Sequence, residues 1–262
     1  MVLVLRPGAL GDTLLAVPAL RALRRAFGSV TLAAHPGAAR FLESVGEVDH
    51  GLAFDDLSLG WLFSDAPHAD AVVAWMGATP ALRDAAVVAP SRPPDMDRQC
   101  ARYLLETLAP LGIDLTWDDH PLGVSRMSSD EVLVHPGSGS PTKNWPPSHF
   151  ARVIHLLASP VRLVVGEADG PVATAVEASL GAPLQRLEQP SLEQLAARLT
   201  GCRAYVGNDS GVSHLAGLCG ARTVAIFGPT DPKVWQPIGP DVHIVSFGAD
   251  PGEVAALAIE TR

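Results

Sequence analysis

The chain opens with MVLVLRPGALGDTLLAVPALRALRRAF, residues 1–27, and this stretch decides the fold class. Val2–Leu5 is a short, continuous apolar run with β-branched residues, which predicts a strand buried on both faces of a parallel sheet. A glycine turn follows, and a helix is predicted from Asp12 or Thr13 to about Phe27 because apolar residues recur there at helical spacing. Strand, turn and helix together form the first half of a βαβ unit.

The same order continues along the chain. Further strands are predicted at 30–34, 71–75 and 85–89, with helices at 39–45 and 98–111. The pattern begins again at 132–135, followed by strands at 161–165, 204–206, 223–227 and 242–247 and by helices at 148–157, 173–180, 192–199 and 211–219. Strands that alternate with helices predict doubly wound parallel sheets with right-handed crossovers.

Two domains are predicted from this pattern and from the length of 262 residues, since a domain takes about 100–200 residues. The polar segment Gly123–Asp130 is the candidate linker. The predicted lobes are therefore residues 1–125 and residues 126–262, each an α/β lobe of the Rossmann-like kind.

Composition excludes several classes of protein. Hydrophobic residues make up 47% and charged residues 18%, which is typical of a globular protein. A formal net charge of -9 disfavours nucleic acid as a partner. No apolar run reaches the ~20 residues of a membrane span, and the first residues indicate a strand rather than a signal peptide. The cysteines are scattered and odd in number, which fits a reducing cytoplasm: Cys100, Cys202 and Cys219.

The first loop with chemical interest is RPGALGD, residues 6–12, directly after the first predicted strand. Gly8 and Gly11 allow close approach of a backbone or a substrate. The loop has neither the G-x-G-x-x-G spacing of a dinucleotide site nor the lysine of a P-loop. Two interpretations of Asp12 stay open. It is an N-cap, worth ~1 kcal/mol, or a general base directed into a cleft.

Two further loops contain candidate phosphate ligands. HPGSGSPTKNWP, residues 135–146, contains Lys143, one of only two lysines in the chain; a solvated surface lysine is the alternative. VGNDSGVSH, residues 206–214, precedes an apolar helix, so the backbone N–H groups near Ser210 and Gly211 are expected to face a diphosphate. Asp209 is a natural N-cap, and His214 is either structural or catalytic.

These loops together resemble bacterial glycosyltransferase family 9, the ADP-heptose:lipopolysaccharide heptosyltransferases. The matching stretches are RPGALGDTLLAVPALRALRRAF, HPGSGSPTKNWPPSHF and GNDSGVSHLAGLCGARTVAIFGPTDPKVW, in the expected order. The resemblance implies a GT-B architecture with two Rossmann-like lobes that face a central cleft. Residues 1–125 would form the acceptor-side lobe and residues 126–262 the nucleotide-sugar lobe.

The resemblance also implies a reaction. A sugar, heptose for this family, would move with inversion and without a metal from a nucleotide diphosphate such as ADP-heptose to a glycan or lipopolysaccharide-core-like acceptor. Asp12 matches the catalytic aspartate, with Gly8 and Gly11 in the loop beside the cleft. The residues that match the donor site are Lys143, Asp209, Ser210, Gly211, His214 and, loosely, Glu167 as the acid that holds the ribose, with Asp169 as its rival.

A cytoplasmic enzyme without a resident cofactor is expected, with weak peripheral contact at the inner face of the cytoplasmic membrane. The chain departs from the family in its short first lobe. Arg98 stands where family members often have a histidine before the pair Arg102-Tyr103. Two other functions stay open, a nucleotide-sugar epimerase or hydrolase and a non-catalytic sugar-nucleotide-binding protein. A nicotinamide dehydrogenase is disfavoured because its glycine fingerprint is missing.

Overall fold

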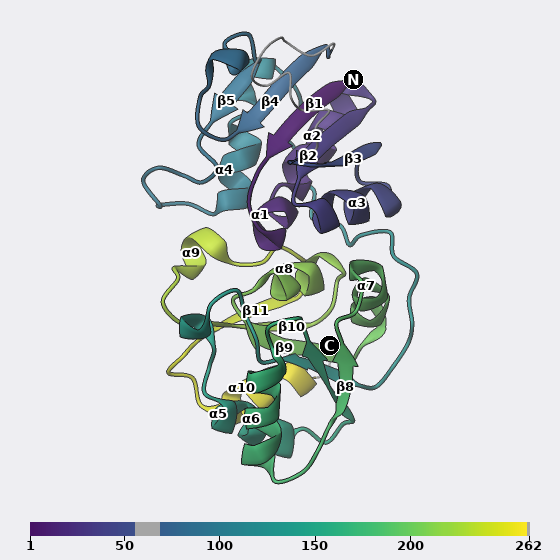
Figure 1. Cartoon of the computed structure of the whole chain (residues 1–262), viewed down its shortest axis with the longest axis vertical. Coiled ribbons are helices and arrows are strands. Elements are labelled where there is room, and N and C mark those ends of the chain that lie inside the picture. Colours follow the sequence, from purple (N-terminus) through teal and green to yellow (C-terminus); the bar gives the residue numbers. More distant parts are fainter. Residues whose placement is uncertain (56–68, 261–262) are drawn as a thin grey trace. The chain divides into compact units, whose positions relative to one another are not determined.

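The computed structural model describes residues 1–55 and 69–260. It divides into two compact units, Met1–Asp119 and His120–Arg262 (Figure 1). The predicted linker Gly123–Asp130 contains no helix or strand and is attached to the second unit. Within it the Val124 N–H donates to Leu122 and the Ser129 N–H donates to Gly201, at 2.7 and 2.8 Å.

The first unit contains a five-stranded parallel sheet in the order β3-β2-β1-β4-β5. Its strands are β1 Val2–Arg6, β2 Val30–Ala34, β3 His50–Ala53, β4 Ala71–Trp75 and β5 Val87–Ala89. Its helices are α1 Leu10–Leu14, α2 Val17–Phe27, α3 Pro36–Ser44 and α4 Cys100–Glu106, with short 3₁₀ turns η2 Pro80–Leu82 and η3 Ala109–Leu111.

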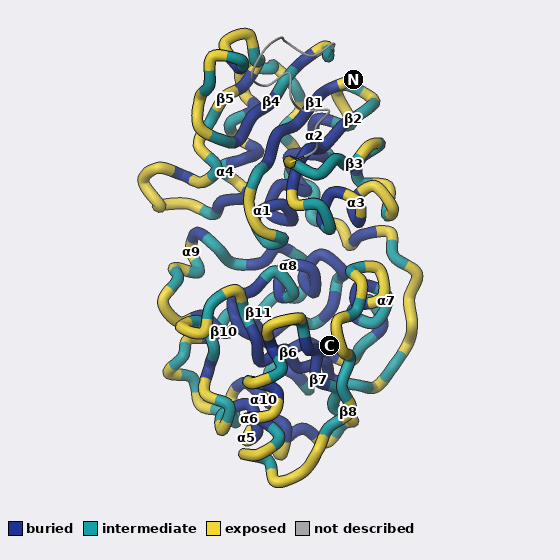
Figure 2. The backbone as a smooth tube through the Cα atoms, viewed as in Figure 1, coloured by how far each residue is buried: buried dark blue, intermediate teal, exposed yellow. Residues whose placement is uncertain are grey.

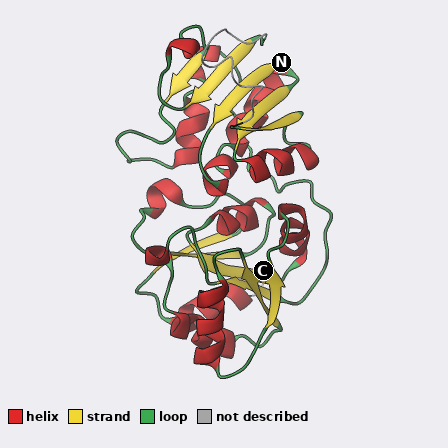
Figure 3. Ribbon diagram, viewed as in Figure 1, coloured by secondary structure: helices red, strands yellow, loops and turns green. Residues whose placement is uncertain are grey.

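The second unit contains a six-stranded parallel sheet in the order β11-β10-β9-β6-β7-β8 (Figure 3). Its strands are β6 Val132–His135, β7 Val161–Val165, β8 Gln185–Glu188, β9 Ala204–Asn208, β10 Thr223–Phe227 and β11 Val242–Ser246. Helices α7 and α8 lie on one side of the sheet and α5, α6 and α10 on the other (Figure 1). Their bounds, with the remaining short helices, are η4 Pro141–Lys143, α5 Pro147–Leu156, α6 Gly170–Leu180, α7 Leu192–Gly201, α8 Gly211–Leu218, α9 Pro232–Trp235 and α10 Pro251–Ile259.

The central strands of both sheets form the cores. All residues of β1, β2, β6, β9 and β10 are buried, as Figure 2 shows in dark blue. Helices cover both faces of a doubly wound sheet, so such strands are apolar on both sides, which is why continuous apolar runs predicted them. Edge strands β3 and β8 are only partly buried and were missed, because their sequences HGLA and QRLE show no apolar run.

Two predicted helices are interrupted at prolines. The helix expected up to Phe27 is divided into α1 and α2, because Pro18 has no N–H to donate to the carbonyl of Leu14. The chain instead makes a tight turn there, in which the Ala16 N–H donates to Thr13 O at 3.0 Å. Pro110 likewise separates α4 from η3 within the helix predicted at 98–111.

The strand orders place one reversal point in each sheet. In the first sheet the chain builds outward from β1 on one side and from β4 on the other; in the second the corresponding neighbours are β6 and β9. Ligands of open α/β sheets bind outside the carboxyl ends of strands at such points. Three loops singled out from the sequence follow β1, β6 and β9, so each lies at a reversal point.

None of the helices in the described part of the chain combines the length and apolar character that crossing a bilayer requires.

Candidate functional site

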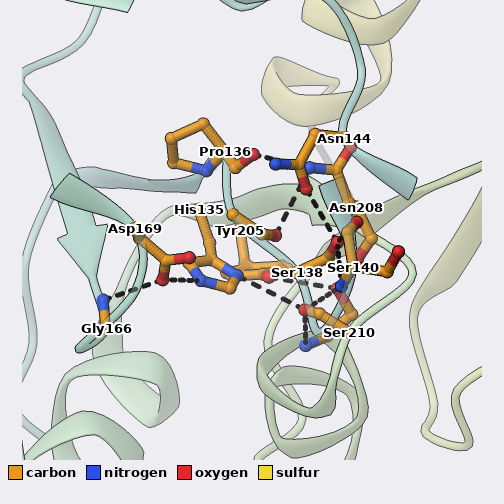
Figure 4. Close-up of polar contacts among 12 residues, drawn as sticks. His135, Pro136, Ser138, Ser140, Asn144, Gly166, Asp169, Tyr205, Asn208 and Ser210 are labelled. Atoms are coloured by element: carbon orange, nitrogen blue, oxygen red, sulfur yellow. Dashed lines mark hydrogen bonds and ion pairs between the residues drawn. The ribbon is translucent and has the colours of Figure 1, made fainter. Parts of the chain in front are cut away.

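At the carboxyl ends of β6 and β9, one asparagine side chain organises the loops. Asn208 is fully buried at the end of β9. Its Oδ1 accepts the Trp145 N–H at 2.9 Å, and its Nδ2 donates to Pro136 O at 2.8 Å (Figure 4). These bonds attach both ends of the loop after β6 to β9. Ser138 closes the loop internally by donating to Asn144 Oδ1 at 2.7 Å.

The loop holds Lys143 in an ion pair. The Lys143 Nζ lies 2.7 Å from Asp209 Oδ2, and the Thr230 hydroxyl donates to the same oxygen at 2.6 Å. The Asp209 side chain is 6% exposed and the Lys143 side chain 30% exposed. Because an ammonium has three donors, Lys143 keeps donors for a ligand while Asp209 holds it in place. Lys143 is thus brought to the end of β9, close to the start of α8.

The N-cap of helix α8 is Ser210, not Asp209 as the sequence suggested. The Ser210 Oγ accepts the Ser213 N–H at 3.4 Å and is the N-cap, whereas the Asp209 carboxylate is occupied by Lys143 and Thr230. The N–H groups of Gly211 and Val212 belong to the first turn, where backbone donors have no acceptor within the helix. Both residues are partly exposed, and backbone donors at such a position suit an anion.

Behind this turn lies a buried chain of polar groups. The His135 imidazole lies between the Asp169 carboxylate and the Ser210 hydroxyl (Figure 4). Nε2 is 2.9 Å from Asp169 Oδ2, and Nδ1 is 3.3 Å from Ser210 Oγ. Burial opposes ionisation of Asp169, but the bonds from His135 and from the Gly166 N–H outweigh it and lower the pKa of Asp169.

The Asp169 carboxylate also explains why residue 137 is a glycine. A Cβ on Gly137 would lie 1.9 Å from Asp169 Oδ1, so the loop after β6 and the loop after β7 approach each other only with glycine there. Asp169 is therefore engaged inside the protein by His135 and by the Gly166 N–H. Glu167, two residues earlier, is exposed and makes no hydrogen bond or ion pair with the described residues.

His214 is buried within α8, with 4% of its surface exposed. The five residues predicted from the two loops of the second unit, Lys143, Asp209, Ser210, Gly211 and His214, lie together around the start of α8. Sequence reasoning missed His135, Asn208 and Thr230. His135 lies at the end of a predicted strand and Asn208 two residues after one, and these positions were their only signal.

Asp12 lies in the first unit, in the loop after β1. It is the third residue of α1, so it is not the N-cap; its Oδ2 accepts the Ala9 N–H at 2.9 Å, and Ala9 is the N-cap. Gly8 has φ +138, and a Cβ there would lie 2.9 Å from Asp12 Cβ. Gly8 thus allows the turn that presents Asp12, and Gly11 precedes Asp12 inside α1.

A buried arginine stands behind Asp12. The Arg6 side chain is 1% exposed, and its Nη2 lies 3.5 Å from Asp12 Oδ1, while the Asp12 side chain remains 31% exposed. Burial lowers the pKa of Arg6, and the Asp12 carboxylate partly offsets this. Arg6 was not predicted as part of the site. It provides a fixed positive charge at the inner side of a partly exposed carboxylate.

Two nearby carboxylates in the first unit could in principle hold a metal ion. The sequence contains Asp95-Met96-Asp97, and the structure places both carboxylates against Arg98, at 3.6 and 3.0 Å. Among residues 1–55 and 69–260 there is no group of three or more His, Cys, Asp or Glu side chains suited to a metal ion.

The second unit thus has the features of an α/β protein that binds an anionic ligand at the reversal point of a parallel sheet. The family model "Glycosyltransferase family 9 (heptosyltransferase)" matches residues 105–254, more than half of the chain. The chain belongs to glycosyltransferase family 9.

Several curated relatives agree with this assignment. Lipooligosaccharide heptosyltransferase 2 of Haemophilus influenzae is 27% identical over 113 residues, which cover 40% of this chain and 33% of that protein. Lipopolysaccharide heptosyltransferase 1 of Pseudomonas aeruginosa is 35% identical over 109 residues, covering 38% of this chain and 29% of that protein. The matched part thus spans about a third of the length of these relatives.

Solved structures share the fold over nearly the whole chain. A glycosyl transferase family 9 protein from Veillonella parvula superposes with a TM-score of 0.82 at 17% identity, covering 99% of this chain and 97% of that chain. The E. coli ADP-heptose lps heptosyltransferase II gives 0.76 at 18% identity, with coverage of 99% and 98%. The predicted fold class, a GT-B type with two Rossmann-like parallel-sheet lobes, is confirmed.

Proposed function

We propose that the chain transfers a heptose from a nucleotide diphosphate donor, ADP-heptose, to a glycan or lipopolysaccharide-core-like acceptor. The carrying observation lies at the carboxyl ends of β6 and β9, where the ion pair with Asp209 brings Lys143 next to the start of α8. A cation and a helix N-terminus together suit a diphosphate. The solved relatives named above and an E. coli heptosyltransferase WaaC with ADP, at a TM-score of 0.72, add support.

The proposed reaction is a direct displacement with inversion. The acceptor hydroxyl oxygen attacks the anomeric carbon of the sugar, and the bond from that carbon to the diphosphate oxygen breaks. The hydroxyl proton passes to Asp12, whose partly exposed carboxylate has room to accept it. The diphosphate leaves with the bonding electron pair.

The growing negative charge on the diphosphate needs stabilisation in this scheme. Lys143 and the N–H groups of Gly211 and Val212 provide it without a metal ion. Asp209 and Thr230 hold Lys143 in place. Glu167, exposed after β7, is assigned to the ribose hydroxyls, and His214 to the helix that supports the phosphate loop. A cytoplasmic location with weak peripheral membrane contact stays a prediction.

An assay of ADP-heptose turnover with and without acceptor tests this function. We expect ADP release that requires a lipopolysaccharide-core acceptor, with the heptose recovered on that acceptor. ADP release of equal rate without acceptor would indicate a hydrolase, and an isomerised sugar would indicate an epimerase. Binding of ADP without any turnover would indicate a sugar-nucleotide-binding protein.

A further inference from the structure

His135 joins three strand-end loops, yet the proposed transfer reaction gives it no role. It stands at the end of β6, contacts Asp169 from the loop after β7 and contacts Ser210 from the loop after β9. Its side chain is 5% exposed and that of Asp169 is 11% exposed. A side chain covered to this extent acts on a ligand only through its neighbours, and Ser210 is the neighbour that faces the predicted diphosphate site.

The hydrogen atoms in the hydrogen bonds between Asp169, His135 and Ser210 can be assigned from the chemistry of these groups. An ionised Asp169 carboxylate only accepts, and its Oδ2 also takes the Gly166 N–H at 2.8 Å, so His135 Nε2 is the donor. When the imidazole carries this single ring hydrogen, Nδ1 is an acceptor. The Ser210 hydroxyl faces Nδ1 and donates to it, while its oxygen accepts the Ser213 N–H.

A second set of hydrogen bonds fixes the direction of the neighbouring Ser213 hydroxyl. The Ser213 Oγ contacts the Asn208 carbonyl oxygen, which only accepts, so Ser213 donates its single hydroxyl hydrogen there. Tyr205 is therefore the donor in its 3.0 Å contact with Ser213 Oγ. Ser213 therefore has no hydrogen for its 3.4 Å contact with Ser210 Oγ and can only accept there, and His135 Nδ1, at 3.3 Å, is the nearer of the two acceptors that the Ser210 hydroxyl faces. The Ser210 hydroxyl hydrogen is directed inward, and its lone pair is directed at the first turn of α8.

We propose that His135 is a positioning residue of the nucleoside diphosphate site, which locks the Ser210 hydroxyl as the cap of α8 and so keeps the Gly211 and Val212 N–H groups directed at the ligand. This inference rests on the diphosphate site proposed above. His135 touches no reacting atom; it sets the orientation of the donors that do.

Two substitutions separate the two halves of the imidazole. His135→Asn keeps an amide oxygen near Nδ1, as an acceptor for Ser210, and loses the donor to Asp169. His135→Gln keeps an amide N–H near Nε2 and loses the acceptor. ADP binding should become about three- to tenfold weaker in the Gln variant, as for one lost hydrogen bond, and change less than about twofold in the Asn variant. Adenosine, measured by displacement of ADP, should bind both variants like the parent.

A double-mutant cycle tests whether His135 acts through Ser210. Ser210→Ala should weaken ADP binding, and His135→Gln should then have no further effect in the Ser210→Ala background. If His135→Gln weakens ADP binding by the same factor in both backgrounds, or weakens adenosine equally, the proposal is overturned. A parent protein that does not bind ADP would contradict the donor site itself, which is a different failure.

A spectroscopic measurement on the parent does not depend on how the variants fold. Long-range ¹H–¹⁵N spectra at neutral pH should show the His135 proton on Nε2 and a bare Nδ1. This tautomer is what the carboxylate and hydroxyl contacts require. A proton on Nδ1 with Nε2 bare would reverse the assigned directions and overturn the proposal.

Discussion

At the scale of single residues, the contact of Asp12 with the Ala9 N–H and its proposed chemical role can be separated by substitution. Its Oδ2 accepts the Ala9 N–H, which an asparagine oxygen can also accept. An asparagine cannot take a proton from an attacking hydroxyl. Asp12→Asn should therefore lower the transfer rate by ~10²–10⁴, the usual contribution of a general base, and leave ADP affinity unaltered. Steady-state transfer and calorimetric ADP titration measure the two quantities.

The buried Arg6 determines how substitution of Asp12 changes the free energy of unfolding. If Asp12 only accepted the Ala9 N–H, Asp12→Asn would leave the free energy of unfolding unchanged. Both Asn and Ala, however, remove the carboxylate that faces the Arg6 guanidinium, whose side chain is 1% exposed. We expect Asp12→Asn to lose ~1–3 kcal/mol of unfolding free energy and Asp12→Ala somewhat more, because Ala also leaves the Ala9 N–H without its acceptor. A near-parental transfer rate in Asp12→Asn would show that another group is the base.

Lys143 can be compared with the other lysine of the chain. Lys143→Ala should weaken ADP binding by ~1.5–3 kcal/mol, the range of a charge-assisted hydrogen bond. The upper part of this range is expected, since the substitution also leaves the buried Asp209 carboxylate without its cation beside an anionic ligand. Lys233→Ala, on the exposed start of α9, is the matched control and should bind ADP like the parent. Equal affinities for all three proteins would make Lys143 a structural residue only.

Residues of this site differ in how far the sequence predicts them. Lys143 and Ser210 were predictable because each stands in a small-residue loop after an apolar run. The pairing of His135 with Asp169 spans 34 positions, and that of Lys143 with Asp209 spans 66. One sequence contains no signal for which side chains of separate loops meet. Ion-pair partners were therefore out of reach even where the loops were identified.

At the scale of elements, burial decides what periodicity can predict. The strands predicted at 132–135 and 223–227 have those bounds in the structure, because a strand buried along its whole length is an almost continuous apolar run. Helix α10 was not predicted, although Asp250 caps it and Pro251 stands at its first position. Helix breaks at Pro18 and Pro110 show that proline outweighed apolar spacing in both cases.

The loop after β6 contains two glycines that test how closely this loop must approach Asp169 in the loop after β7. Gly137→Ala would place a methyl group 1.9 Å from Asp169 Oδ1, whereas Gly139→Ala meets nothing within 4 Å. We expect Gly137→Ala to lose ~1–3 kcal/mol of unfolding free energy, as for an overpacked core position, and to weaken ADP binding. Gly139→Ala should change neither. Denaturant unfolding and ADP titration of both variants measure this, and equal behaviour of the two would refute the close approach.

At the scale of the whole molecule, the proposed chemistry is distributed over two units. The carboxylate proposed as base belongs to the unit Met1–Asp119, and the cation and helix N-terminus proposed for the diphosphate belong to the unit His120–Arg262. The chain is acidic, with a formal net charge of -9, so a diphosphate must be attracted by local rather than global charge. Each unit has a sheet with one reversal of strand order, and the loops at the carboxyl ends of the strands beside that reversal contain the proposed base and the proposed diphosphate ligands.

We expect the reaction to require no metal ion, because the protein itself balances the charge of the leaving group. A diphosphate leaving group gains negative charge, which Mg²⁺ neutralises in many enzymes. Here Lys143 and the start of α8 are assigned that task, and Asp95 and Asp97 contact Arg98 instead. ADP release from ADP-heptose should therefore proceed at the same rate after treatment with EDTA and after addition of Mg²⁺ or Mn²⁺. Strict dependence on an added cation would contradict this assignment. Loss of the cation-stimulated rate in an Asp95→Asn/Asp97→Asn variant would then identify Asp95 and Asp97 as the metal ligands.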